Sequence, residues 1–355
     1  MSVRRVGLLV SGGDCPGLNA VLRAVLKAGA GELGLEIVGI RDGYKGLLTP
    51  VMAGCLEPGA MRGLLPLGGT ILGTSRTDPY HCRGADGEAV NRSAELFANV
   101  ASLGLDGVIV VGGDGSLRVA RDLHAQGLPV VGVPKTIDND IGHTDLTFGF
   151  DSAVTTAQEA LDKLHTTAES HHRVMVVEVM GRDVGWIALA AGISGGADAI
   201  LIPEIPFSLL PVVQKIDERD RAGKLFSIVV VSEGAAPLGG AAEYVDKGAR
   251  RLGGMGETVA ASLARLTGHE VRAIVLGHLQ RGGSPSSFDR LLATRFGSAA
   301  AHLVAHGGFG RMVALRRSSI VDVPIASAVA RLKHVPLDGQ LLRTARDIGI
   351  TLGEP

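Results

Sequence analysis

The stretch Val6–Asn19, VGLLVSGGDCPGLN, decides the fold of this chain. A short apolar run, Val6–Val10, ends in the glycine-rich turn Ser11–Asp14, and a helical pattern begins at Leu18. A strand, a glycine turn and a helix in that order are typical of an α/β unit whose backbone can approach a phosphate closely. Taken alone, this turn fits phosphate binding and a plain strand-to-helix connection about equally well.

Similar apolar runs alternate with segments of helical period along the rest of the chain. We expect further strands at Ile37–Ile40, Val108–Val111, Val130–Val133, Val174–Val179, Ala199–Ile202, Ser227–Val231 and Val271–Leu276. We expect helices at Leu18–Ala28, Val90–Leu103, Leu117–Ala125, Asp151–Ala168, Leu209–Arg221, Glu257–Leu266 and Asp289–His306. Continuous apolar strands alternating with helices indicate buried parallel sheets, so the predicted fold class is α/β with doubly wound, mainly parallel sheets.

The composition excludes several classes of protein. A chain of 355 residues is long enough for two domains, and its 35 basic and 36 acidic residues are interleaved without the basic arm or patch of a nucleic-acid-binding protein. No apolar run could span a bilayer, and the N-terminal residues carry no cleavage signature. Cys15, Cys55 and Cys82 form neither a CxxC pair nor a zinc-binding cluster. We therefore expect a cytoplasmic protein with no nucleic-acid or membrane partner.

Glycines and polar residues follow several of the predicted strands, at the ends where ligands collect in parallel sheets. In Gly112–Ser116, Asp114 lies among backbone N–H groups, as Mg²⁺ bridging two phosphates requires, although it could merely cap the next helix. In an extended segment, Asp138 and Asp140 would point to the same side, and one of them could act as a general base. An Asx-rich turn without chemistry is the alternative.

Four arginines flank two of the predicted strands, namely Arg173, Arg182, Arg272 and Arg281. Guanidinium groups bind phosphate bidentately, so the set suggests an anionic substrate. Each arginine alone is better explained as a solvated strand flank, and His278 alone as a hydrogen-bonded structural histidine. Their clustering with the glycine turns is what favours an active site.

Long motifs cover the chain from Val6 to about Ala330, namely SGGDCPGLNAVLR, GGTILGTSR, VVGGDGSL, PKTIDNDI, GFDSAV, VEVMGRDVGW, IPEIPF and VLGHLQRGGSPSSFDR. Together they resemble the phosphofructokinase family. The resemblance implies two α/β domains facing each other across an active-site cleft. Residues 1–149 with about 280–331 would form the nucleotide side, and 150–279 with about 332–355 the sugar-phosphate side. The implied activity is that of a Mg²⁺-dependent glycolytic kinase, which phosphorylates the 1-hydroxyl of fructose 6-phosphate to give fructose 1,6-bisphosphate.

The resemblance also implies roles for single residues. The catalytic residues would be Asp138 as general base, Arg182 as electrostatic clamp, and Thr136 and Asp140 beside the reacting phosphate. The nucleotide and its Mg²⁺ would be bound by Gly12, Tyr44, Arg76, Asp114, Gly115, Ser116 and Lys135, with Asp114 as the metal ligand. The sugar phosphate would be bound by Thr136, Asp138, Met180, Gly181, Arg182, Glu233, His278 and Arg281. Arg173 and Arg272 would reach the 6-phosphate in a neighbouring subunit, which implies a homo-oligomer and favours a homotetramer.

Gly115 and Lys135 indicate different phosphate donors. Members of the family that use pyrophosphate usually have Asp at the position of Gly115 and Lys at that of Lys135, whereas users of ATP usually have Gly at both. Val119 also stands where bacterial ATP users often have glycine. An aspartate at Gly115 would repel the α-phosphate of ATP, so we expect ATP as donor and keep pyrophosphate as the alternative.

Other readings remain open at this point. A catalytically silent sugar-phosphate sensor would be expected to lack Asp114 or Asp138, and both are present. A different kinase with a GGDG turn, acting on NAD or a lipid, would not explain TIDND or GHLQRGGSP. The effector site of bacterial phosphofructokinases is only partly matched, because Arg23, Lys27 and Lys224 fit its basic groups while His165, Asp198 and Ala222 depart from it. We therefore expect weak or altered allosteric control.

Overall fold

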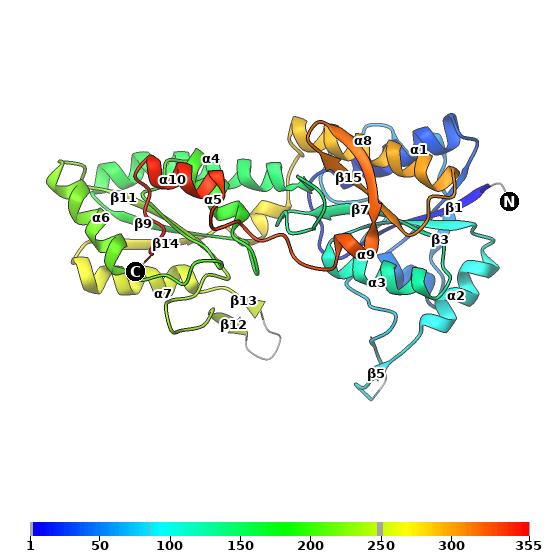
Figure 1. Cartoon of the computed structure of the whole chain (residues 1–355), viewed down its shortest axis with the longest axis horizontal. Coiled ribbons are helices and arrows are strands. Elements are labelled where there is room, and N and C mark those ends of the chain that lie inside the picture. The colour runs from blue at the N-terminus through cyan, green and yellow to red at the C-terminus, as the bar shows by residue number, and fades with distance from the viewer. Residues whose placement is uncertain (1–2, 85, 247–250, 355) are drawn as a thin grey trace. The chain divides into compact units, whose positions relative to one another are not determined.

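The structure, a computed structural model, describes residues 3–84, 86–246 and 251–354. The chain forms two compact units (Figure 1). Unit 1 comprises Met1–Ser152 and Arg281–Leu332, and unit 2 comprises Ala153–Gln280 and Lys333–Pro355. The chain therefore passes from one unit to the other three times. In the part of the chain that the structure describes, no helix is both long and apolar enough to cross a membrane.

Unit 1 is built on an eight-stranded sheet in the order β16-β15-β7-β6-β1-β2-β3, with β8 paired to β7. The strands are β1 (Arg5–Ser11), β2 (Glu36–Ile40), β3 (Ala53–Cys55), β6 (Gly107–Gly112), β7 (Val130–Thr136), β8 (Phe148–Gly149), β15 (Arg311–Arg316) and β16 (Ser319–Pro324). The five neighbours from β15 to β2 run parallel, and the two edge strands β3 and β16 are antiparallel to them. Every residue of β6 and β7 is buried, as continuous apolar strands between two helix layers should be.

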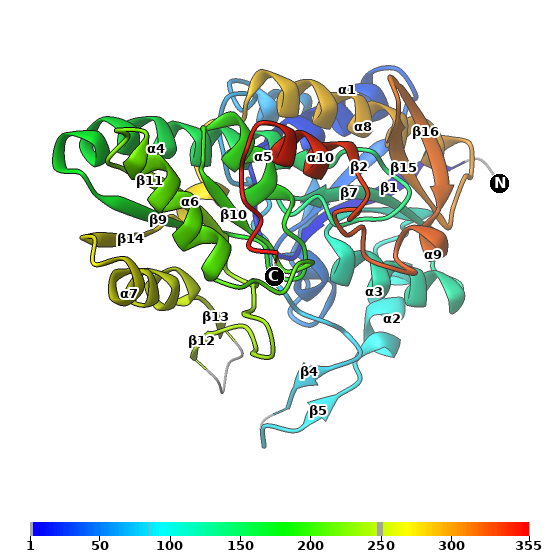
Figure 2. The same cartoon turned by 60° about the vertical axis from the view of Figure 1, so that its left-hand side comes forward.

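Helices cover both faces of the unit 1 sheet. They are α1 (Leu18–Gly31), α2 (Ser93–Ser102), α3 (Asp114–Ala125), α8 (Ser287–Ala305) and α9 (Ile325–Ala328). Figures 1 and 2 show α1 and α8 side by side on one face, and α2 and α3 on the other. Smaller elements connect these layers, namely η1 (Gly43–Leu47), η2 (Pro58–Met61) and the hairpin of β4 (Cys82–Arg83) and β5 (Ala89–Val90).

Unit 2 is built on a parallel four-stranded sheet in the order β10-β11-β9-β14. Its strands are β9 (Val174–Val179), β10 (Ala199–Leu201), β11 (Ser227–Ser232) and β14 (Val271–Val275). Its helices are α5 (Trp186–Ser194), α6 (Leu210–Arg221), α7 (Met255–Thr267), α10 (Gln340–Asp347) and most of α4 (Phe150–His171). Residues of α6 and α7 share one hydrophobic cluster with β9, β10 and β11, while α4 and α5 lie on the other face. The remaining elements are η3 (Gly277–Arg281), β12 (Tyr244–Asp246) and β13 (Arg251–Leu252).

The predicted α/β class with mainly parallel sheets is confirmed, and each expected strand and helix is present, most of them with shifted ends. One expectation about burial is wrong. The run at Val271–Leu276 was expected to be buried like the others, but β14 is the edge strand of its sheet and Val275 is 51% exposed. Sequence patterns also missed α5, because its segment is apolar on all sides and so has no helical period.

Candidate active site

Two glycine turns lie at the same edge of the unit 1 sheet. Because β1 and β6 are parallel neighbours with Ser11 opposite Gly112, the turns that follow them are adjacent. Ser116 Oγ donates to Ser11 Oγ at 3.1 Å, and a Cβ on Gly12, whose φ is +91°, would be 3.1 Å from the same Ser116 Oγ. The structure thus brings Gly12 and Ser116 together as predicted, with close backbone approach that a larger residue at Gly12 would strain.

Tyr44 supports this arrangement without lining it. The side chain is buried in η1, and its hydroxyl donates to the carbonyl oxygen of Ser116 at 2.8 Å. A side chain that is 1% exposed has almost no surface with which to touch a ligand. Tyr44 therefore holds the backbone of the second glycine turn and does not line the space beside it.

Asp114 is the first residue of α3, after the N-cap residue Gly113. It is not the capping residue, so the alternative of a plain cap does not describe it. Its Oδ2 accepts from Arg118 Nε at 2.7 Å, an i,i+4 pair that sequence reasoning missed. Next to it, Gly115 has open space where a side chain would project: apart from its chain neighbours and the backbone of its own helix, no heavy atom of the described residues lies within 4 Å of a Cβ placed there.

The segment after β7 differs from the expectation. Asp138 and Asp140 were expected to share one side of an extended segment, but the chain turns directly after Thr136. Asp138 N donates to Thr136 Oγ1 at 3.0 Å, and Asn139 adopts a left-handed φ of 53°. Thr147 N donates to the Asn139 side chain at 3.2 Å, which holds that turn. The hydrogen-bonded turn, and not an extended strand, brings the two carboxylates near each other.

Asp140 is the most perturbed carboxylate of this turn. Burial raises its pKa to about 7, with a further rise from the negative charge of Asp138 and a smaller one from Asp114. Its Oδ1 is buried and has no hydrogen-bond partner among the described residues. A buried carboxylate oxygen of this kind is suited to hold a proton or to receive a donor from a ligand.

Asp114 is the candidate ligand for a metal ion at this site. Among the described residues, no three His, Cys, Asp or Glu side chains form a cluster that could hold a metal. Mg²⁺ commonly binds through one or two carboxylates together with phosphate oxygens and water. Asp114, beside two glycine turns, fits that mode of binding and does not fit a cage made of protein ligands alone.

Two cationic side chains, Lys135 and Arg281, donate hydrogen bonds to carbonyl oxygens of the first glycine turn. The Lys135 ammonium is buried and donates to the Gly13 carbonyl oxygen, and burial lowers its pKa. Arg281 Nη1 donates to the carbonyl oxygen of Asp14 at 3.1 Å. Arg281, which was expected to bind the sugar phosphate from the segment 280–331, belongs to unit 1 and contacts this turn. Lys135 is therefore committed to the backbone of the turn in this structure.

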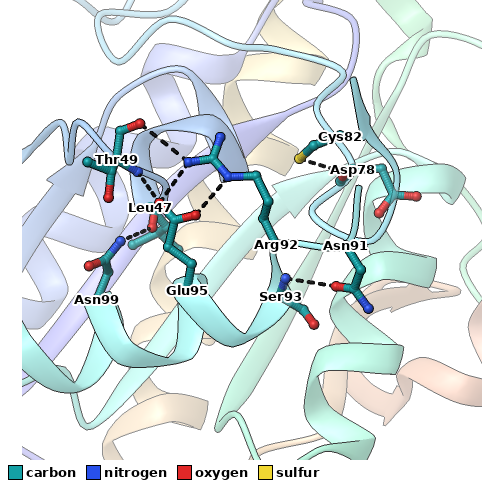
Figure 3. A network of polar contacts seen from close by, with 9 residues as sticks. All are labelled: Leu47, Thr49, Asp78, Cys82, Asn91, Arg92, Ser93, Glu95 and Asn99. Atoms are coloured by element: carbon teal, nitrogen blue, oxygen red, sulfur yellow. Dashed lines mark hydrogen bonds and ion pairs between the residues drawn. The ribbon is translucent and has the colours of Figure 1, made fainter. Parts of the chain in front are cut away.

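Arg76 lines a basic cavity in unit 1 that the sequence did not reveal. The cavity has a volume of about 530 Å³ and its basic lining residues are Lys45, Arg76, His81, Arg83 and Arg92. Figure 3 shows how one wall is fixed: Arg92 donates through Nε and Nη2 to the two carboxylate oxygens of Glu95, each at 2.7 Å. Glu95 also accepts from Thr49 N at 2.7 Å, and these bonds lower its pKa to about 2.

In unit 2, the predicted sugar-binding residues follow the central strand and its two neighbours. Met180, Gly181 and Arg182 follow β9, Glu233 follows β11, and His278 lies in η3 after β14. Gly181 adopts a φ of +142°, and the side chains of Arg182 and His278 are exposed. The carboxyl ends of three parallel strands therefore bring these five residues to one edge of the sheet.

Arg173 and Arg272 lie at the opposite edge, because they stand at the amino ends of β9 and β14. Both guanidinium groups donate to Glu270 Oε1, at 2.9 and 2.5 Å. A strand of six residues is roughly 20 Å long, so these arginines are far from the residues that follow the same strands. The structure thus separates these two arginines from the other predicted sugar-binding residues of their own sheet, and their expected role in a neighbouring subunit stays a prediction.

The residues compared with the effector site are also separated between the units. Arg23 and Lys27 are on α1, whereas Asp198, Ala222 and Lys224 line a cavity of about 310 Å³ in unit 2. The Asp198 carboxylate is already used, since it pairs with Arg219 Nη1 at 2.8 Å and accepts from Ile228 N at 2.9 Å. His165 forms a 2.7 Å hydrogen bond between its Nε2 and the Gly195 carbonyl oxygen.

Carboxylates beside two glycine turns are typical of enzymes that transfer phosphoryl groups. Residues 5–304 match the family described as Phosphofructokinase. The chain is 52% identical over 352 residues to an ATP-dependent 6-phosphofructokinase of Chloroflexus aggregans, covering 99% of this chain and 98% of that protein. It is 49% identical over 356 residues to ATP-dependent 6-phosphofructokinase 1 of Synechocystis sp., covering 99% of both. The chain therefore belongs to the phosphofructokinase family.

Solved structures are similar over almost the whole chain. The phosphofructokinase of Pichia pastoris in the T-state aligns with a TM-score of 0.80 and 34% identity, over 93% of this chain and 36% of that longer chain. A pyrophosphate-dependent phosphofructokinase of Marinobacter aquaeolei aligns with a TM-score of 0.82 and 23% identity, over 99% and 93% of the two chains. The second likeness shows a shared fold alone.

Proposed function

We propose that this chain is an enzyme that phosphorylates fructose 6-phosphate at its 1-hydroxyl with ATP, giving fructose 1,6-bisphosphate. Two relatives, 52% and 49% identical over nearly the full length, are named as ATP-dependent 6-phosphofructokinases. The observation within the structure that supports it is the grouping of Asp138 and Asp140 beside the glycine turns of unit 1. By the same proposal, unit 1 binds the nucleotide, unit 2 binds the sugar phosphate, and the enzyme works in the cytoplasm.

Asp138 is the general base in this mechanism. It removes the proton from the 1-hydroxyl of the sugar, and the resulting alkoxide attacks the γ-phosphorus of ATP as the bond to the β-phosphate oxygen breaks. The raised pKa of Asp140 leaves the two carboxylates in different environments, which lets them divide the roles of base and hydrogen-bonding partner. The exposed Arg182 guanidinium stabilises charge on the transferring group.

Asp114 would hold the Mg²⁺ that accompanies the nucleotide. The ion, when bound, neutralises charge on the donor's phosphates. The backbone of the two glycine turns and the hydroxyl of Ser116 bind and orient the phosphates, with Tyr44 fixing Ser116 from behind. Arg76, which lines the basic cavity, adds positive charge in the unit that binds the nucleotide.

The donor assignment depends on Gly115 and Lys135. The open space at Gly115 accommodates an α-phosphate, and the Lys135 ammonium donates to the Gly13 carbonyl. A lysine engaged with the backbone of the turn no longer argues for a free terminal phosphate, so it does not favour pyrophosphate as it did in the sequence. A coupled assay at saturating fructose 6-phosphate tests the choice: we expect a higher kcat/KM with ATP, and a higher value with pyrophosphate would contradict it.

The proposed function includes assembly of the chain into a homotetramer. Arg173 and Arg272 lie at the sheet edge opposite Met180 and His278, so they cannot complete the sugar site of their own sheet. A neighbouring subunit is the remaining place where this arginine pair could bind the 6-phosphate, and a homotetramer provides it. Light scattering should show a tetramer, and an active monomer would rule the arrangement out.

A further inference from the structure

The loop after β9, Met180–Arg182, is held by one buried polar side chain on each side. Ser232, the last residue of β11, donates its hydroxyl to the Gly181 carbonyl oxygen at 2.6 Å. Gln280, which follows β14, accepts from Met180 N at 3.3 Å and donates to the Gly277 carbonyl oxygen at 3.1 Å. Both side chains are fully buried, and β11 and β14 are the two neighbours of β9. The loop is thus fixed from both flanks.

The backbone of this loop packs too closely against its neighbours to leave room for a side chain at two glycines. A Cβ on Gly181 would be 2.4 Å from Ser232 Oγ and 2.7 Å from the Val184 carbonyl oxygen. A Cβ on Gly234 would be 1.8 Å from the Arg182 carbonyl oxygen, and Gly234 N donates to the Gly181 carbonyl oxygen at 3.1 Å. Two donors, one from a side chain and one from the backbone, therefore fix the direction of the Gly181 carbonyl.

The direction of that carbonyl determines the direction of the next N–H. A trans peptide is planar, so the N–H of Arg182 points away from the side on which the Gly181 carbonyl oxygen is bound. Among the described residues this N–H has no acceptor. It belongs to the same residue whose guanidinium is exposed and placed in the proposed mechanism.

We propose that Ser232 and Gln280 are positioning residues of the sugar-phosphate site. They orient the Gly181–Arg182 peptide so that the Arg182 N–H donates a hydrogen bond to an oxygen of the bound sugar phosphate. This inference rests on the proposed function of unit 2 as the sugar-phosphate unit. Neither side chain touches the substrate, so both act through the backbone of the loop.

The neutrality of the two side chains has a consequence for binding. Neither Ser nor Gln titrates between pH 5 and 9, so their removal should weaken sugar binding without altering its pH dependence. A preformed donor also loses little entropy when the ligand binds, because the loop is already ordered. Loss of either side chain should therefore raise the dissociation constant for the sugar phosphate and leave the donor site as it was.

The test uses the full-length protein and its single tryptophan. Trp186 begins α5, four residues after Arg182, so its fluorescence can report binding of fructose 6-phosphate in the absence of turnover. For Ser232→Ala and Gln280→Leu we expect a dissociation constant about three- to tenfold higher than for the wild type, as for the loss of one oriented hydrogen bond. The KM for ATP should stay within about twofold, and the pH profile of kcat/KM should not shift.

Ser227→Ala is the matched control. Ser227 is buried at the amino end of the same strand, so this variant removes the same atoms from β11 far from the loop. Its affinity for fructose 6-phosphate should equal that of the wild type. If Ser232→Ala and Gln280→Leu, folded by circular dichroism, bind the sugar phosphate as tightly as Ser227→Ala, the inference is wrong. If the wild type itself neither binds nor phosphorylates fructose 6-phosphate, the proposed function fails instead.

Where Ser232→Ala does not fold, Gln280→Leu provides the test by itself, because it acts from the opposite flank of the loop. A fall in ATP affinity equal to the fall in sugar affinity would also overturn the inference. Such a result would mean that the two side chains stabilise the chain in general and do not orient this peptide.

Discussion

The two units hold their candidate site residues by different physical means. In unit 1, charged groups are buried or paired: the Lys135 ammonium donates to a glycine turn, Asp140 has a buried oxygen without a partner among the described residues, and Asp114 pairs with an arginine. In unit 2, neutral side chains such as Ser232 and Gln280 hold a backbone loop. Buried charge sets protonation and rate, whereas neutral hydrogen bonds set geometry. Changes to these charged groups of unit 1 should therefore affect the chemistry and the donor, and changes to these neutral side chains of unit 2 should affect the sugar.

The largest effect should come from Asp138→Asn in unit 1. Loss of a general base lowers kcat by roughly 10²–10⁴-fold, while the neutral amide leaves fructose 6-phosphate binding close to that of the wild type. Steady-state kinetics and Trp186 fluorescence separate the two quantities. The control is Asp122→Asn, a change of the same kind at a carboxylate paired with Arg121 on α3. A variant of Asp138 with more than a tenth of the wild-type kcat would contradict the assignment.

A smaller effect is expected from Gly115→Asp. An added carboxylate beside the α-phosphate brings two like charges within a few ångströms, so kcat/KM for ATP should fall about tenfold to a hundredfold. Pyrophosphate has no α-phosphate, and activity with it should not fall in parallel. The KM for fructose 6-phosphate should stay within about twofold, as a change confined to unit 1 requires. An equal loss with both donors would show that Gly115 does not discriminate between them.

A third prediction concerns stability and pH. Burial, aided by Asp138, raises the pKa of Asp140 to about 7 in the folded chain, so the folded state binds this proton more tightly than the unfolded state. Its contribution to stability is therefore complete below about pH 4 and is lost as the pH rises towards 7. Asp140→Asn removes that loss, and Tm at pH 8 should rise by about 2–5 °C.

At pH 4.5 the Asp140→Asn variant and the wild type should melt at nearly the same temperature, because the wild-type carboxyl is then protonated when folded. Thermal unfolding followed by circular dichroism at both pH values checks this. The same shift at both values would show that the effect of the amide is not electrostatic. No comparable pH dependence is expected for Ser232→Ala in unit 2, where the altered group does not titrate.

The smallest effect is expected for allosteric control. Asp198 is already paired with Arg219 and hydrogen-bonded to Ile228 N, and Ala222 supplies no charge to the cavity that it lines. Phosphoenolpyruvate at micromolar concentration should therefore change the rate by less than about twofold. The measurement is the initial rate over a range of phosphoenolpyruvate concentrations. Strong inhibition that disappears in Arg23→Ala would show that the remaining basic groups suffice.

Where the sequence placed candidate site residues close together, a strand end was enough to place them. Gly12, Asp114 and Ser116 follow parallel neighbouring strands, so adjacency in the sheet brings them together without further information. The same rule held for Met180 and His278 in unit 2. It also sets Arg173 and Arg272 apart from them, because these arginines stand at the amino ends of β9 and β14.

Other features depend on hydrogen bonds that no pattern reveals. The turn at Asp138 depends on the Thr136 hydroxyl and on a left-handed Asn139, and an extended segment was equally compatible with the letters. The commitment of Lys135 to Gly13 depends on where a flexible side chain is buried. The basic cavity near Arg76 is formed by segments far apart in sequence, so only the folded chain shows it.

The sheet of unit 1 is completed by strands that come late in the chain. This order affects how the protein can fold during synthesis. β15 pairs with β7 through Arg311 and Met312, so the sheet cannot be completed before these residues leave the ribosome. By then the four strands of the unit 2 sheet have been made, although Thr351, which bridges to β10 at Ala199, is still missing. In a nascent chain that is stopped after Ala305, we expect unit 2 to resist protease more than unit 1. Unit 1, whose first residues are synthesised before those of unit 2, should therefore fold last.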